Sequence, residues 1–109
     1  MRTELPVIPE LRLDLPRPDV GDAVRVGALV GDPVRAGILA ILRGGPHCVC
    51  EMAAALGERQ NNVSNHLARL REAGLVRASR HLADARWMYY ERDEVAIDAA
   101  AASLREVLR

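Results

Sequence analysis

The sequence contains no phenylalanine and no lysine, only three aromatic residues, and no apolar run long enough to cross a membrane. Residues 1–18 carry acids among the basic residues and lack the continuous apolar centre of a signal peptide, so we expect a cytoplasmic protein without membrane partners. The two cysteines, Cys48 and Cys50, are one residue apart and cannot build the disulfide framework of a secreted protein. In a reducing compartment, such spacing suggests metal or redox chemistry.

A length of 109 residues indicates one domain with about enough core to be stable alone, although many chains of this size complete their core by dimerising. The formal net charge of zero conceals an uneven distribution. Residues 57–92 contain seven arginines and four acids, whereas the segments before and after them carry net charges of −1 and −2. A modest positive field therefore lies where a polar helix is expected.

Four prolines in the first 19 residues deny this segment a helix, so residues 1–19 are expected to form an extended arm. The arm is either disordered, which is favoured, or a strap over a dimer partner. Residues 20–109 are expected to form the folded domain, beginning with a short helix over 22–30. Asp32 followed by Pro33 is a strong start signal for a second helix, which ends at a Gly-Gly-Pro sequence.

A third short helix is predicted within residues 48–57, and a tight turn separates it from a polar helix that starts at Gln60. This layout is that of a helix-turn-helix. In the polar helix, Val63, Leu67 and Leu70 form one apolar stripe, and the opposite face is rich in amides that can pair with base edges. A solvated polar face is the alternative interpretation. The candidate DNA-contacting residues of this helix are Gln60, Asn61, Asn62, Ser64, Asn65, His66 and Arg69.

Two strands are predicted over residues 75–80 and 86–91, joined by a tip at 81–84, and the second contains all three aromatic residues. A helix-turn-helix followed by a β-hairpin is a winged helix, so the predicted fold is mainly α with a β-hairpin wing, of the α+β class. Arg80 and Arg86 lie on the two sides of the tip, where they can meet phosphate or the minor groove of DNA. A solvated hairpin end is the alternative.

The last predicted helix covers residues 93–108 and carries a stripe of mainly small residues. Such a stripe lets another helix approach closely. We therefore expect a homodimer through the first and last helices, which would set two recognition helices one turn apart on double-stranded DNA. The stripe consists of Val95, Ala96, Ala99, Ala100, Leu104 and Leu108.

Cys48 and Cys50 are expected at the start of the third helix, where residues two apart point about 200° from each other. Two thiolates can share one ion only if their sulfurs lie within roughly 4 Å, so ion binding is expected to unwind the helix start. That movement would couple ion binding to DNA binding. The alternatives are that both cysteines are buried core residues, or that His47 adds a nitrogen ligand for zinc or cadmium.

Motifs at residues 30–35, 48–52, 62–67 and 70–76 follow one another at separations that resemble those of the ArsR/SmtB family of winged-helix metal-sensing repressors. The resemblance covers about residues 20–95. It implies a homodimer that represses an operator, expected to be an inverted repeat, until an inducer binds.

The Cys-Val-Cys sequence resembles that of the arsenite and antimonite sensors of this family, which implies As(III) or Sb(III) as the inducer at Cys48 and Cys50 and no permanently bound cofactor. Those sensors often have a third cysteine, and its absence leaves the third arsenic position to water, hydroxide, an outside thiol or the carbon of an organoarsenical. The last helix contains no histidine, so the zinc site of other family branches is not expected there. Arg59 and Asn61 replace the small cap and the proline usual in the family.

Three functions remain open from the residues. The first is a repressor relieved by trivalent arsenic or antimony, and the second is a repressor on the same scaffold that responds to thiol oxidation or to zinc or cadmium. The strained ring of a Cys-Val-Cys disulfide disfavours the redox variant. The third is a small dithiol enzyme such as an arsenate reductase, which is disfavoured because the sequence shows neither an oxyanion loop nor a general acid beside the cysteines.

Overall fold

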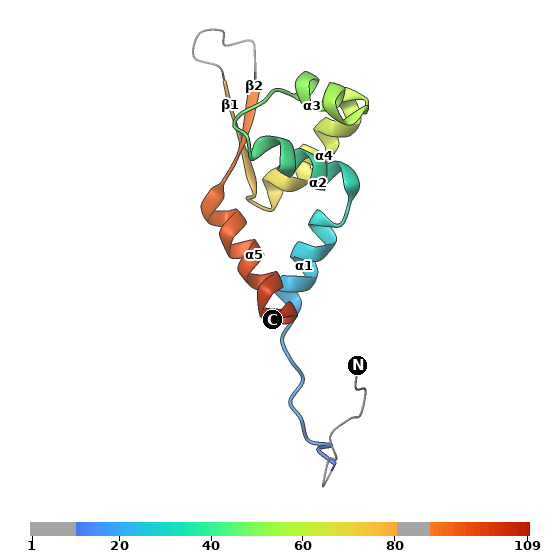
Figure 1. Ribbon diagram of the computed structural model, residues 1–109, viewed down its shortest axis with the longest axis vertical. Helices are drawn as coiled ribbons and strands as arrows, with labels where there is room; N and C mark the ends of the chain where they lie inside the picture. Colours follow the sequence, from blue (N-terminus) through green and yellow to red (C-terminus); the bar gives the residue numbers. More distant parts are fainter. Residues whose placement is uncertain (1–10, 81–87) are drawn as a thin grey trace, which may run out of the picture.

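The computed structural model describes residues 11–80 and 88–109, which fold as five helices and one two-stranded hairpin (Figure 1). These elements confirm the predicted winged helix-turn-helix, with bounds within two residues of those expected from the sequence. In chain order they are α1 (Gly21–Val30), α2 (Pro33–Leu42), α3 (Val49–Leu56), α4 (Gln60–Glu72), β1 (Val76–Arg80), β2 (Met88–Arg92) and α5 (Glu94–Leu108).

The start of α2 confirms the predicted helix signal. Asp32 is the N-cap, and its Oδ1 accepts hydrogen bonds from the amides of Val34, at 2.8 Å, and Arg35, at 3.1 Å, while Pro33 holds the first helical position. These bonds satisfy two of the amides that have no partner inside the helix. The same bonds, with the one from the Arg35 amide first, lower the pKa of Asp32, so its carboxylate stays charged.

The hydrophobic core lies between α2, α3 and α4. Its largest fully buried side chains are Ile38 from α2, Met52 from α3, and Val63, Leu67 and Leu70 from α4. The predicted apolar stripe of the polar helix therefore faces the core. Because that stripe is buried, the amide-rich side of α4 is turned toward solvent.

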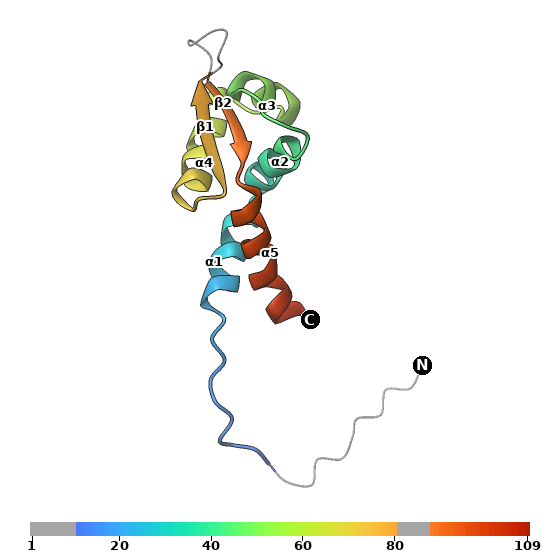
Figure 2. The same ribbon diagram turned by 90° about the vertical axis from the view of Figure 1, so that its left-hand side faces the viewer.

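The wing is an antiparallel pair in which Val76 of β1 lies opposite Arg92 of β2. The hairpin packs against one side of the three helices, where β1 contacts α4 and β2 contacts α2 and α3 (Figure 2). Ahead of α3, His47 forms a further antiparallel bridge with Tyr90. The His47 amide donates to the Tyr90 carbonyl oxygen at 3.1 Å, and the Tyr90 amide donates to the His47 carbonyl oxygen at 2.9 Å. The loop that leads into α3 is thus bonded to the wing.

The helices α1 and α5 lie side by side and extend away from the rest of the domain (Figures 1 and 2). The predicted stripe of α5 divides between two surroundings, because Ala96, Ala100 and Leu104 are half-buried whereas Val95 and Leu108 are largely exposed. No residue of α5 is fully buried, so much of its surface is open in the single chain. Within residues 11–80 and 88–109, no helix is long and apolar enough to cross a membrane.

Candidate functional site

The solvent-facing side of α4 is a row of polar side chains. Five of the seven candidate DNA-contacting residues of this helix are exposed, and two are half-buried. Arg59 stands at the N-cap without a side-chain cap bond, as its poor capping chemistry predicts. The exposed five are Gln60, Asn61, Ser64, Asn65 and Arg69.

Asn62, one of the half-buried pair, holds the turn before α4. Its side-chain Nδ2 donates to Glu58 Oε2 at 2.9 Å. Because this bond occupies one amide proton, Asn62 helps fix the entry of the helix, and a contact with DNA through its remaining groups stays a prediction.

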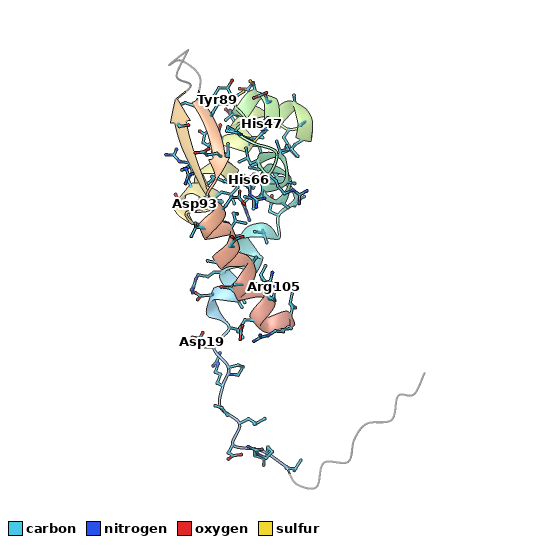
Figure 3. All side chains as sticks on the ribbon, turned by 60° about the vertical axis from the view of Figure 1, so that its left-hand side comes forward. Asp19, His47, His66, Tyr89, Asp93 and Arg105 are labelled. Carbon is cyan, nitrogen blue, oxygen red and sulfur yellow. The ribbon has the colours of Figure 1, made fainter. Side chains whose placement is uncertain are left out.

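His66, the other half-buried residue, is turned toward α2 (Figure 3). Its Nδ1 lies 2.9 Å from Nη1 of Arg35, and its Nε2 lies 3.9 Å from Oδ1 of Asp32. Both ring nitrogens therefore have neighbours inside the protein. A direct DNA contact by His66 remains a prediction, whereas its place at the edge of the core is established.

The two wing arginines are only partly covered by the described residues. Arg80 is the last residue of β1, and its backbone pairs with Met88. Arg86 and the predicted tip lie outside the described residues. The contacts of both arginines with phosphate or the minor groove therefore remain predictions.

The cysteine pair lies where α3 begins, but the two residues stand in different backbone conformations. Cys48 is the N-cap, with extended backbone at φ −89° and ψ 166°, whereas Cys50 is inside the first turn of the helix. The two Sγ atoms lie 2.8 Å apart. The expectation that the side chains point in opposite directions was wrong, because it placed both residues on a regular helix and Cys48 stands just outside it.

This geometry removes the need for unwinding. Thiolates that share one zinc or arsenic atom need sulfurs within roughly 4 Å, and the pair already satisfies that limit. The alternative in which both cysteines are core residues is also wrong. Cys48 is 7% exposed, but Cys50 is only half-buried, so a ligand can reach the pair from solvent.

A capping box surrounds the Cys48 thiol. Glu51 Oε1 accepts a hydrogen bond from the Cys48 amide at 3.0 Å, and this bond lowers the pKa of Glu51. Burial, followed by the hydrogen bond with the Cys50 sulfur, raises the pKa of the Cys48 thiol to about 11. Cys48 is therefore a neutral thiol near pH 7. A glutamate three residues after the cap position is a signal for this box, but cysteine is not a usual N-cap residue, so the sequence motif did not predict it.

His47, the alternative nitrogen ligand, has other partners in the structure. Besides its backbone bridge to Tyr90, its ring Nδ1 lies 2.9 Å from the Gly45 carbonyl oxygen. Among the residues that the structure describes, no three His, Cys, Asp or Glu side chains gather in a cluster that could hold a metal ion. Within the described residues the two thiols therefore stand without a third such side chain, and their role as metal ligands remains a prediction.

Comparison with known proteins agrees with the fold and the sequence motifs. Residues 32–78, which run from the α2 cap through the cysteine pair and α4 to β1, match the family described as "Bacterial regulatory protein, arsR family". The chain also resembles a possible transcriptional regulatory protein (fragment 1–100) from Mycobacterium bovis, with a TM-score of 0.62, 27% identity, and coverage of 81% of this chain and 92% of that one.

Three relatives illustrate the match in sequence. The Arsenic resistance transcriptional regulator ArsR1 of Pseudomonas putida is 46% identical over 52 residues, which cover 48% of this chain and 38% of the relative. The Arsenical resistance operon repressor of Escherichia coli is 34% identical over 68 residues, which cover 62% and 56%. The HTH-type transcriptional regulator MJ1325 of Methanocaldococcus jannaschii is 35% identical over 69 residues, which cover 62% and 74%. The chain thus spans about two fifths to just over half of the two arsenic regulators.

Proposed function

Because the chain belongs to the arsR family of bacterial regulatory proteins, we propose that it represses transcription and leaves its operator when trivalent arsenic or antimony binds Cys48 and Cys50. A member of this family is a transcription regulator and not an enzyme, which removes the dithiol-enzyme alternative. The observation that carries the proposal is the pair of sulfurs 2.8 Å apart at the first helix of the helix-turn-helix. A DNA-reading protein of this kind works in the cytoplasm.

The DNA-reading part of the proposal depends on the exposed side of α4. Asn61 and Asn65 offer amides that can pair bidentately with adenine, and Arg69 offers a guanidinium suited to guanine or phosphate. The buried stripe on the opposite side holds the helix in place, so these side chains are free to enter a major groove.

The thiol pair suits a trivalent metalloid for a chemical reason. Each arsenic–sulfur bond forms as an arsenic–oxygen bond breaks, and the departing hydroxide takes the thiol proton as water. The overall reaction of protonated thiols such as that of Cys48 with neutral arsenous acid therefore releases no net proton to solvent. With two protein sulfurs bound, the third arsenic position keeps a hydroxide, takes an outside thiol, or carries the carbon of an organoarsenical.

Two contacts would carry a change at the thiols to the DNA-binding surface. The helix α3 packs directly on α4, and the His47 backbone pairs with Tyr90 in the wing. Cys48 connects these contacts, because it follows His47 directly in the chain and is the N-cap of α3. An arsenic atom bound to both sulfurs would hold Cys48, the cap of α3, and Cys50 in one geometry, and we expect this to change how α3 packs on α4 and on β2.

We propose that a second copy of the chain completes the DNA-binding protein as a homodimer. Large apolar side chains of α1 and α5 are exposed in the single chain, including Val24 at 62%, Val107 at 51% and Leu108 at 80%. Covering them in a homodimer would remove apolar surface from water and set two α4 helices against an inverted repeat.

The experiment is fluorescence anisotropy of a labelled operator duplex, selected by the protein from a random library, with arsenite, antimonite or phenylarsine oxide added. Arsenite is expected to release the duplex from wild-type protein but not from Cys48→Ser or Cys50→Ser. Ala54→Ser, an exposed position of α3, is the matched control and should respond like wild type. If arsenite still released the duplex from Cys48→Ser and from Cys50→Ser, these cysteines could not be the arsenic site.

The closeness of the sulfurs also favours a second candidate, in which oxidation releases the DNA. A peroxide would accept two electrons from the Cys48 and Cys50 thiols, giving one disulfide bond and two waters. Release by hydrogen peroxide that dithiothreitol reverses, with no response to arsenite, would support this candidate over the first.

A further inference from the structure

Arg35 joins three helices through one side chain. It lies in the first turn of α2 and is half-buried. Its Nε donates to the Leu29 carbonyl oxygen at 2.5 Å, and its Nη2 donates to the Ala28 carbonyl oxygen at 3.3 Å. Both carbonyls belong to the last turn of α1, where backbone oxygens have no partner inside the helix and a cation is favoured by the helix dipole.

The remaining guanidinium nitrogen reaches the recognition helix. Nη1 of Arg35 lies 2.9 Å from Nδ1 of His66, which projects from the middle of α4 (Figure 3). Because a guanidinium can only donate, His66 Nδ1 must be the unprotonated acceptor. Asp32, which caps α2, lies 3.9 Å from the other ring nitrogen and completes the surroundings of the imidazole.

We propose that Arg35 is a positioning residue for DNA recognition, because its guanidinium holds the end of α1 and, through His66, sets the orientation of α4. This inference uses the DNA-binding part of the proposed function but neither the cysteines nor an inducer. Its failure can therefore be told apart from failure of the arsenic response.

The contacts of Arg35 predict which kind of DNA binding it affects. Hydrogen bonds to base edges weaken steeply when their angle changes, so α4 must be oriented accurately to read a sequence. Contacts to phosphate depend mainly on charge and tolerate small shifts. We call the bonds of Arg35 to the Leu29 and Ala28 carbonyls and to His66 the Arg35 clip. Its loss should therefore reduce affinity for the operator more than affinity for random DNA.

The test compares Arg35→Gln with Arg43→Gln, which removes the same charge from an exposed position at the other end of α2. Affinities are measured for the selected operator and for a random duplex of equal length. Arg35→Gln is expected to lower operator affinity on the order of tenfold, which corresponds to the loss of one or two hydrogen bonds to a charged group. On random DNA, the affinity of Arg35→Gln should fall only as little as that of Arg43→Gln. An equal loss on both duplexes would overturn the proposal.

The partner residue provides a rescue test. His66→Gln retains a side-chain oxygen that can accept from Arg35, whereas His66→Leu is of similar size but accepts nothing. The glutamine variant is expected to keep more operator selectivity than the leucine variant. Equal selectivity in the two variants would contradict coupling through this hydrogen bond.

A spectroscopic reading tests the clip without DNA. The Nε–H proton of Arg35 should exchange slowly with solvent in ¹H–¹⁵N spectra of the full chain, because it is bonded to the Leu29 carbonyl. In His66→Leu this proton should exchange faster, while sedimentation shows an unchanged oligomeric state. Fast exchange in the wild-type protein would overturn the proposal even if the operator measurements failed for another reason.

Discussion

The pH dependence of inducer binding separates a metalloid from a divalent cation. The Cys48 thiol has a pKa of about 11, so about one molecule in ten thousand carries the thiolate at pH 7. Cadmium must displace this proton into solvent, whereas arsenous acid removes it as water together with its own hydroxide. The two ligands therefore differ in the number of protons that binding releases.

The expected magnitudes follow from that stoichiometry. Between pH 6 and 8, the affinity for cadmium should rise about tenfold per pH unit from Cys48 alone, because the free thiol is fully protonated throughout this range. The affinity for arsenite should stay nearly constant, since two thiols and arsenous acid give a dithiolate complex and two waters without releasing a proton.

Isothermal titration calorimetry in two buffers with different ionisation enthalpies counts these protons directly. We expect about zero protons for arsenite and at least one for cadmium, with neither ligand bound by Cys48→Ser. Arsenite affinity that climbs tenfold per pH unit would refute the reasoning, because it would mean that binding releases one net proton to solvent.

Three further predictions concern the fold and the DNA-reading surface. Leu67 is 1% exposed, so Leu67→Ala should lower the free energy of unfolding, measured in urea, by about 2–5 kcal/mol. Leu108 is 80% exposed, and Leu108→Ala should change that free energy by less than about 0.5 kcal/mol in the single chain. Similar losses in the two variants would contradict the core assignment. The raised pKa of Cys48 means that the folded state holds the thiol proton more tightly than the unfolded chain does. The free energy of unfolding of the wild-type protein should therefore fall by less than about 3 kcal/mol as the pH rises from about 9 to about 11. Thermal melts of Cys48→Ser should lack this pH-dependent loss of stability. In filter-binding assays, Asn65→Ala should weaken binding to the operator by about 1–3 kcal/mol and have little effect on binding to random DNA. Arg80→Ala should weaken binding to both DNAs and flatten its salt dependence. Equal effects of Asn65→Ala on the two duplexes would contradict base recognition by α4.

Much of the fold could be predicted from the sequence because its signals are local. The Asp32-Pro33 cap and the stripe of Val63, Leu67 and Leu70 depend on residues within a few positions of one another. Helix bounds and the order of elements follow from such short-range patterns. The same is true of the exposed amide row on α4, because burying one face of a helix determines which residues face solvent.

The tertiary structure decided what the functional side chains do. Whether Cys48 belongs to α3 or stands just before it changes the direction of its thiol. The position of Cys48 depends on the hydrogen bond that its amide donates to Glu51, and on the backbone pairing of His47 with Tyr90, which lies more than forty positions away. In the same way, the contact between Arg35 and His66 joins residues 31 positions apart, which no periodicity can reveal. Distances of a few ångströms between separate elements depend on how the whole chain packs, so the sequence alone determined the helices and their polar faces but not the sulfur pair or the Arg35 clip.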